Sequence, residues 1–499
     1  MPKLNSKLPG GLRSAKIALC AAAAVGLAGI SAARADTTDM LLQELRAKGV
    51  LTKHEFSKLK ARHAAEKAAY HRAGPPMGMV VKGPAPEYVT VCPKHICMRV
   101  GQVDVSLSGD LVFAGMENFK AHAGGNPATA GLVLGGLAGG STVNNQNAFG
   151  AGLLPSALVL SLSTNQMGYD LGFTIGAYTG GNNVGWGALG ANSGGFASAL
   201  GTPGIDLRQI FGTVGTPTVG TFKIGRDLGL FGGDAILNDA TLLGVGSAPG
   251  TITGNGNTTL GRIGLGYVYA DWLPGVSYTT PDYNGFTATI GAFSPLNTAV
   301  NLAAPFSGVY TGQDTPMVQG RLKYVGNVSP DLKLTLSTAG IWQQHRLEAA
   351  TFFQGAGAKA QSVGIDGFGR ADFYGFSLVG YGYYGSGLGT TGLFFDGFSP
   401  NGQARKSYGG YVQGQYTFYK NFTIGGSWGI SALESNSFDV LTFYNPFLLR
   451  SNESFVGFAR YQLTTWMALQ GEYTHTISKN QSGGNMQEDT FALGTAWFF

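Results

Sequence analysis

The sequence has 499 residues, of which 80 are glycine, about 16% against a typical share of roughly 7%. Charged residues make up only 12%, which excludes a disordered, highly charged chain, and the glycines lack the three-residue period of collagen. The single long apolar run lies near the N-terminus, so a helical membrane protein is excluded as well. The composition is typical of an all-β chain with many strands joined by glycine turns.

The charge is unevenly distributed along the chain. Residues 1–35 carry five of the 33 basic side chains and no acidic one, which leaves 28 basic residues against 28 acidic residues. Within that remainder, residues 36–99 have a net charge of +5 and residues 100–499 a net charge of −5. No basic stripe that would attract a nucleic acid is left, so we expect no nucleic-acid partner.

Residues 1–35 have the organisation of a secretory signal peptide. A basic region from Lys3 to Lys16 precedes an apolar core from Ile17 to Ile30. Ala33-Arg34-Ala35 then offers small residues for cleavage before Asp36. The sequence therefore predicts an exported protein.

Residues 36–73 are predicted to form a short helical hairpin. Two amphipathic stripes are separated by Gly49, and Thr52-Lys53-His54-Glu55 is a capping box at the start of the second. The segment from Leu42 to Phe56 resembles a short module with the pattern L-x-x-L-x-x-x-G-V-L-T-x-x-E-F. Its role is either a periplasmic segment for trimerisation or cell-wall contact, or a solvated spacer.

Residues 74–97 are predicted to be a proline-rich linker that carries a cysteine pair. Once the signal peptide is removed, Cys92 and Cys97 are the only cysteines, and in an exported protein such a pair forms one short disulfide. Two free thiols are the alternative. Zinc fits less well because the spacing is unusual and only His95 lies nearby, so no metal site is predicted.

Residues 98–499 alternate between apolar and polar side chains, which is the pattern of β-strands with two different faces. Between Tyr408 and Lys420, for example, Val412 and Tyr416 lie on one face and Gln413 and Gln415 on the other. Charged and amide groups occur in mid-strand, and short polar turns alternate with long loops. Aromatic residues cluster at expected strand ends, as at Tyr381, Tyr383 and Tyr384, which predicts an interfacial girdle. These features favour a transmembrane antiparallel β-barrel of about 16 strands, estimated at roughly 25 residues per strand and connection.

Several short motifs resemble Gram-negative outer-membrane porins. The last strand, Glu488 to Phe499, ends on phenylalanine, and the stretch from Thr221 to Arg226 is similar to the strand that leads into the porin constriction loop. The hairpin from Gly275 to Phe286 and the cysteine stretch from Cys92 to Arg99 also resemble proteobacterial porins. The acidic P-E-F-G-G constriction motif of the family is missing, which leaves the selectivity of the pore open.

The porin resemblance implies a cell outer membrane location and a water-filled channel for passive diffusion of small hydrophilic solutes and ions. It also implies a homotrimer, contact with outer-membrane lipid and lipopolysaccharide, and Phe499 as the signal read by the barrel assembly machinery. Peptidoglycan is a further candidate partner. In porins the third long loop folds inward, and in this chain that loop spans about residues 227–259.

The resemblance and the alternation together predict which residues line the pore. The predicted acidic groups of the constriction are Asp227, Asp234 and Asp239. The predicted basic groups of the lumen are Lys223, Arg226, Arg262, Arg321, Lys323, Arg370 and Arg460. Alternation from Lys223 puts Arg226 on the apolar face unless the strand has already ended. Opposed charges across a gap set ion preference, and the net −5 of residues 100–499 favours cations weakly.

No catalytic chemistry or cofactor is predicted. Gly380 to Gly385 fits G-x-G-x-x-G, but no helix follows, as a dinucleotide site would require. Zinc-protease and P-loop motifs are absent from the sequence, and its serine, histidine and acidic residues are scattered, so we expect no enzyme. Two alternatives to an open porin remain: a substrate-selective channel for sugars or carboxylates, and a plugged structural or adhesive barrel.

Overall fold

The computed structural model describes residues 56–58, 60–61, 89–91, 96–124, 145–180, 205–247, 258–298, 307–441 and 448–499. The chain divides into two compact units, Met1–Val81 and Lys82–Phe499. In the first unit, the described residues 56–58 and 60–61 are helical, within the predicted helical segment. The predicted signal peptide, the rest of residues 36–73 and most of the linker lie outside the described residues.

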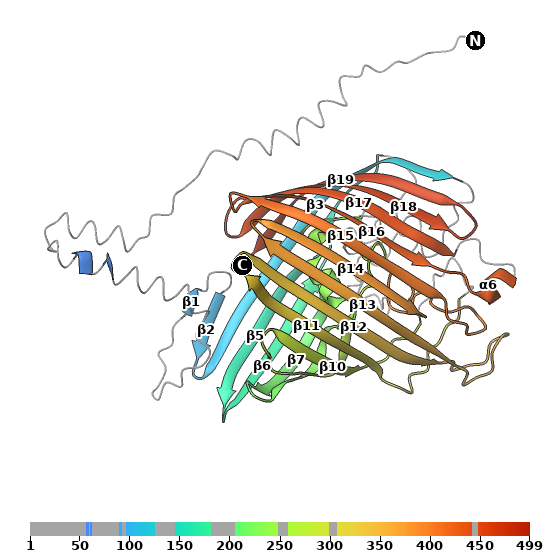
Figure 1. Cartoon of the computed structure of the whole chain (residues 1–499), viewed down its shortest axis with the longest axis horizontal. Coiled ribbons are helices and arrows are strands. Elements are labelled where there is room, and N and C mark those ends of the chain that lie inside the picture. Colours follow the sequence, from blue (N-terminus) through green and yellow to red (C-terminus); the bar gives the residue numbers. More distant parts are fainter. Residues whose placement is uncertain are drawn as a thin grey trace, which may run out of the picture. The chain divides into compact units, whose positions relative to one another are not determined.

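The second unit is built on one continuous sheet (Figure 1). Its nineteen described strands include sixteen that form a closed antiparallel barrel, as predicted from the alternation. The barrel strands are β3 (Val103–Gly124), β5 (Ser156–Gln166), β6 (Tyr169–Thr179), β7 (Ile205–Thr216), β8 (Gly220–Leu228), β9 (Trp272–Thr279), β10 (Phe286–Phe293), β11 (Met317–Ser329), β12 (Leu332–Arg346), β13 (Lys359–Phe373), β14 (Phe376–Ser386), β15 (Lys406–Phe418), β16 (Phe422–Leu433), β17 (Leu449–Gln462), β18 (Met467–Asn480) and β19 (Asn485–Phe498).

The ring closes where the last strand meets the first. β19 pairs antiparallel with β3 along most of its length, from Asn485 opposite Gly124 to Phe498 opposite Asp110. Beyond that point Phe499 exchanges two backbone hydrogen bonds of 3.1 Å with Gly109. Closure pairs the strand edges that an open sheet would expose, which a membrane requires because lipid offers no hydrogen-bond partner.

Three shorter strands lie beside the ring. β4 (Asn147–Ala151) pairs with one end of β3, next to the start of β5. β1 (Val89–Val91) and β2 (Ile96–Val100) form a hairpin, and β2 pairs with the other end of β3, just past the end of β19. Cys97 lies in β2 and is disulfide-bonded, but Cys92 is outside the described residues, so its pairing with Cys97 stays a prediction.

The two ends of the barrel have different connections. At the end that carries the C-terminus and the β1–β2 hairpin, the strands are joined by short turns (Figure 1). In two of the two-residue turns, Met167-Gly168 and Tyr374-Gly375, all four residues have positive φ, as tight hairpins of this type demand. At the opposite end the connections are long, and one contains the helix α6 (Ser437–Leu441). The predicted alternation of short turns and long loops is thus present.

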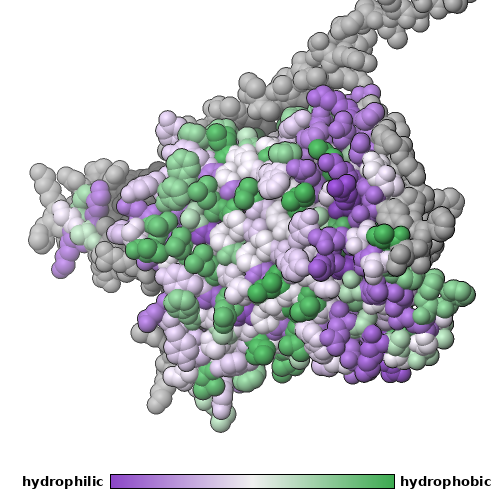
Figure 2. Space-filling view, turned by 45° about the vertical axis from the view of Figure 1, so that its right-hand side comes forward, coloured by the Kyte–Doolittle hydropathy of each residue, from purple (hydrophilic) through white to green (hydrophobic). Residues whose placement is uncertain are grey.

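The outer face of the strands is apolar. Leu322, Ile365 and Val412 are 62%, 60% and 55% exposed, although each lies in the middle of a strand. Figure 2 shows such hydrophobic side chains over the strand wall, with hydrophilic side chains gathered toward the side of the long loops. A continuous apolar band on this scale is what a lipid bilayer covers. The helices of the described residues are all too short or too polar to span a membrane.

The aromatic residues correct one sequence expectation. Tyr381 and Tyr383 were expected in an interfacial girdle, but both point into the barrel and are 7% and 5% exposed, whereas their neighbour Tyr384 is outside. The aromatic cluster on the wall lies instead at the short-turn end of β13 to β16, where ring centroids of adjacent residues lie 4.4 to 5.6 Å apart. That cluster contains Phe373, Phe376, Tyr416 and Phe418.

Candidate pore and its inner loop

The inside of the barrel is occupied in part by one loop. This loop joins β8 to β9, covers residues 229–271, and contains the short helix α4 (Gly233–Asn238) and the 3-10 turn η1 (Ala240–Leu243). Gly232 caps α4 with a φ of 73°, a conformation that favours glycine. Asp239 caps η1, and its side chain accepts a hydrogen bond of 2.9 Å from the Thr241 backbone N–H. The local sequence therefore determines both helical turns. Residues 248–257 of the loop lie outside the described residues.

The start of the loop is bound to the inner wall of β11 and β13. The backbone N–H groups of Leu230 and Phe231 donate to Gln319 Oε1 at 2.7 and 2.9 Å. The next N–H, of Gly232, donates to Asp366 Oδ2 at 2.8 Å. Gln319 and Asp366 are buried, and both lie on the inward phase of their strands. The loop consequently leaves the end of β8 and reaches wall strands far away in the sequence.

The middle of the loop is bound to β15 and β18. Tyr411 donates its hydroxyl to the carbonyl of Ala235 at 2.8 Å, and Gln413 accepts from the backbone N–H of Ala240. Further on, the N–H groups of Val245 and Gly246 donate to Glu472 Oε2 at 2.6 and 2.8 Å. The N–H of Leu153, between β4 and β5, donates to the carbonyl of Gly244 at 2.9 Å. The loop is thus held at several points around the wall.

The returning part of the loop centres on Arg262, which is fully buried. Its Nε donates to Ser427 Oγ at 2.6 Å, and its Nη1 donates to the hydroxyl and the carbonyl of Ser454 at 3.0 and 3.2 Å. Burial lowers the pKa of the Arg262 guanidinium from its usual 12.5 to about 10. Burial, with the nearby Asp239 carboxylate, raises the pKa of Tyr267 well above its usual value. Arg262 therefore fastens the loop to β16 and β17 and presents no charge to water.

The three predicted acidic residues occupy different positions. Asp234, at the start of α4, accepts hydrogen bonds from Lys323 and from Ser337 (2.8 Å), and Arg321 Nη1 lies 3.5 Å away. Asp239 stays within the loop, where its side chain accepts from Thr241 and from the Tyr267 hydroxyl at 2.9 Å. Asp227 still belongs to β8. Only Asp234 therefore joins the loop to basic groups of the opposite wall.

Asp227 is bound on its own side of the barrel. It accepts a hydrogen bond from Lys223, four residues earlier on the same strand, and one of 3.0 Å from Gln209 on β7. Arg226, on the other face of β8, donates to the carbonyl of Trp272 at 3.2 Å and lies 3.8 Å from Asp206. Its cross-strand partner Ile210 is exposed on the outer wall. Strand β8 continues past Arg226 to Leu228, so the alternation places the Arg226 side chain on the outer face of the barrel and not in the lumen.

The other predicted basic residues lie along the loop. Arg321 and Lys323 meet α4 at Asp234, and Arg370 Nη1 donates to Asn238 Oδ1 at 3.0 Å at the other end of the same helix. Arg460 donates to the carbonyl of Ala240 and lies 3.4 Å from Glu472. Four of the seven predicted basic residues therefore lie on wall strands and contact the loop.

Sequence reasoning missed the residues that hold the loop in place. Gln319, Asp366, Gln413 and Glu472 accept hydrogen bonds from loop backbone N–H groups, and Tyr411 donates to a loop carbonyl. Each lies on the inward phase of an alternating strand, so the signal for its direction is present in the sequence. The sequence does not show which group of the loop each side chain contacts, because the two partners lie about 90 to 230 positions apart in the chain.

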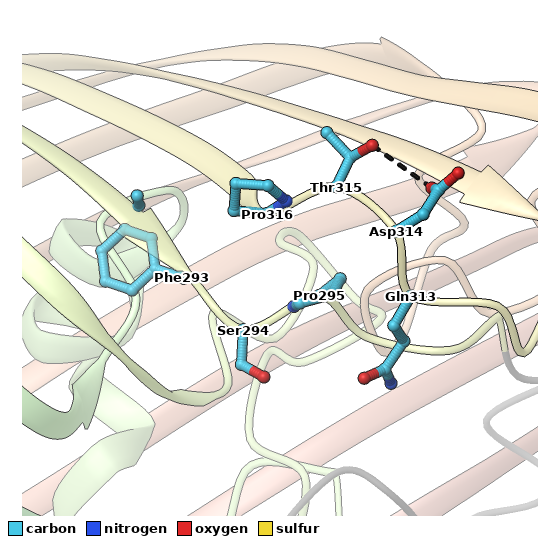
Figure 3. Close-up of a pocket in the computed structure, with 8 residues that line it drawn as sticks. Phe293, Ser294, Pro295, Gln313, Asp314, Thr315 and Pro316 are labelled. Carbon is cyan, nitrogen blue, oxygen red and sulfur yellow. Dashed lines mark hydrogen bonds between the residues drawn. The ribbon is translucent and has the colours of Figure 1, made fainter.

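A depression on the outer rim is a separate feature. It lies between the end of β10 and the start of β11 and is lined by residues 292–295 and 313–316 (Figure 3). The one carboxylate there, Asp314, accepts from Thr315 at 3.2 Å and lies 3.6 Å from Lys359. Among the described residues, no group of three or more histidine, cysteine or acidic side chains is placed to bind a metal.

The comparisons with known proteins bear on the fold alone. Neither the comparison with sequence families nor that with curated proteins gives a match. The outer membrane channel DcaP of Acinetobacter baumannii superimposes with a TM-score of 0.56 at 13% identity, over 80% of this chain and 97% of that one. The fold is that of an outer-membrane porin.

Two further porin structures resemble the chain at lower similarity. The anion-selective porin of Comamonas acidovorans has a TM-score of 0.49 at 14% identity, over 80% of this chain and 100% of that one. Salmonella typhi OmpF, in complex with daunomycin, has a TM-score of 0.48 at 13% identity, over 80% and 98%. On the superposition with DcaP, the porin resemblance predicted from the terminal strand and the hairpin motifs is confirmed at the level of the fold.

Proposed function

We propose that the protein is an outer-membrane porin, a water-filled channel through which small hydrophilic solutes and ions diffuse passively. The observation that carries the proposal is the asymmetric placement of loop 229–271. It is hydrogen-bonded to the inner faces of β11, β13, β15 and β18, while its described residues make no hydrogen bond to β5 or β6. In this proposal a loop that is bound around much of the wall, but not to β5 or β6, narrows a 16-strand lumen and leaves space beside those two strands.

In this proposal the loop is the constriction, and its width and charge sort the solutes. The structural relative DcaP is an outer membrane channel, which supports the same conclusion. No covalent step and no cofactor enters the mechanism. Passage depends on the size of the opening, on hydrogen-bonding groups along the wall, and on fixed charges near the loop.

We also propose a homotrimer surrounded by outer-membrane lipid and lipopolysaccharide, as the porin resemblance implies. Phe499 would serve the assembly machinery as the terminal aromatic residue. The segment of residues 36–73 would contact peptidoglycan or the equivalent segments of the other two subunits. A disulfide between Cys92 and Cys97 would close the hairpin beside β3.

The test is single-channel recording of the refolded mature protein in a planar bilayer. An open trimeric porin gives conductance steps in groups of three. Replacing residues 233–243 by a short glycine–serine linker should increase the conductance and admit larger sugars in a liposome-swelling assay. Absence of current from a barrel shown to be folded would contradict the channel and favour a plugged structural barrel.

A further inference from the structure

Four basic residues form a patch on the inner wall beside α4. They are Arg321 and Lys323 on β11, Lys333 on β12 and Arg370 on β13. The register makes them neighbours, because Lys323 pairs with Ser337, Arg370 pairs with Thr335, and Lys333 lies two residues further along the same inward face of β12. We call these four residues the basic wall patch.

The carboxylates that contact this patch are fewer than its cations. Asp234 and Asp372 are the two that contact the patch, so its four cations leave a net charge of +2. The Asp234 side chain is only 5% exposed, whereas those of Lys323 and Arg321 are 25% and 23% exposed. Lys333 is exposed as well. Asp372 and Arg370 are about equally exposed, at 31% and 33%, so a solute at this patch meets an excess of cations over carboxylates.

The loop itself buries several other carboxylates that point into the barrel. Asp366 and Glu472 are 7% and 2% exposed and accept from backbone N–H groups of the loop, and Asp239 is 4% exposed within it. On the opposite wall Lys223 and Asp227 pair one to one, and the lysine is the more exposed of the two, at 37% against 17%. The charge presented to the lumen is thus more positive than the net −5 of residues 100–499.

Resting on the proposed channel, we infer that the pore prefers anions, and that small organic carboxylates are the solutes that the basic wall patch selects. The guanidinium groups of Arg321 and Arg370 have the planar geometry that carboxylates bind. In addition, the Lys323 ammonium has more donors than Asp234 uses. Fixed charges of one sign beside a narrow passage raise the local concentration of the opposite ion.

The reversal potential across a potassium chloride gradient tests the inference. One fixed charge about 4 Å from an ion changes its local concentration about fivefold in water, and salt reduces this effect. We expect the native channel to favour chloride over potassium by about threefold. The double variant K323Q/K333Q removes the net charge of the patch and should bring the ratio close to one, while D234N should raise it.

A matched control removes a lysine elsewhere. K420Q lies in the short turn between β15 and β16 and should leave the ratio unchanged. In liposomes, acetate and succinate should enter faster than an uncharged solute of similar size, and K323Q/K333Q should abolish that difference. A native preference for potassium, or a double variant that behaves as the native protein, would overturn the inference. A folded barrel without current would overturn the channel itself, and with it this preference.

Discussion

The two sides of the barrel interior have the same strand pattern and different residues. On the side that the loop covers, the inward positions are amides, carboxylates and tyrosines, such as Gln319, Glu472 and Tyr411. In the middle of β5 and β6 they include small hydroxyl residues, such as Ser161 and Thr174, whose oxygens lie 3.2 Å apart. The comparison shows that long polar side chains line the wall where a backbone must be bound, and short ones where space is left.

The largest effect is expected from Glu472, at the centre of the covered side. Glu472→Ala leaves Arg460 buried without its carboxylate and the N–H groups of Val245 and Gly246 without an acceptor. Breaking a buried pair of this kind costs about 3–5 kcal/mol. We expect the loop to leave the wall, with larger and noisier conductance steps and a lower unfolding free energy in denaturant.

Gln470→Ala is the matched control for Glu472. Gln470 lies two residues earlier on β18, faces the same way and is 6% exposed, but its side-chain oxygen and nitrogen have no hydrogen-bond partner among the described residues. Its removal should leave the conductance steps as they are. Equal noise in both variants would mean that the carboxylate does not hold the loop.

A smaller effect is expected from Tyr411, also on the covered side. Tyr411→Phe removes one hydrogen bond of 2.8 Å to the carbonyl of Ala235 and keeps the ring in place. The loss of such a bond costs about 1 kcal/mol. Current noise should increase slightly while the mean conductance stays constant, and Tyr408→Phe on the outer wall should change neither. A large change in mean conductance would show that the hydroxyl faces the solute path.

The smallest effect is expected on the open side. Thr174→Val removes the hydroxyl that meets Ser161 and keeps the shape of the side chain. Because no loop is bound there, we expect the unfolding free energy to change by less than about 0.5 kcal/mol. Single-channel records should show the native noise level. If this variant matched Glu472→Ala in noise, the division into a covered and an open side would be wrong.

Alternation was sufficient to predict the barrel and the direction of most side chains. It places Gln413 and Arg460 inward and Val412 and Tyr461 outward, because each step along a strand reverses the face. It did not identify Tyr381 and Tyr383 as inward residues, since an aromatic residue suits either face, and Tyr381 packs against Tyr267 of the loop. Residues whose environment depends on a distant segment need the tertiary structure.

The candidate site was predictable only in part for the same reason. The inner loop was expected over about residues 227–259, and its described part extends to residue 271 with Asp227 still in β8. Arg262 resembles a lumenal cation in sequence, yet it is buried between the loop and the wall. The net charge of residues 100–499 predicts a weak preference for cations, and this stays a prediction; our inference of an anion preference differs because a residue count does not show which carboxylates the loop covers.

The hydrogen bonds between the wall and the loop backbone have a consequence for how such a channel evolves. Gln319, Asp366, Gln413 and Glu472 all accept from main-chain N–H groups, which every residue except proline supplies. Apart from residues such as Arg262 and Asp234, whose own side chains bind the wall, side chains of the loop can therefore be exchanged while its path through the barrel is kept. A lineage that meets a new nutrient can alter the filter by point substitution, without having to redesign the barrel that holds it.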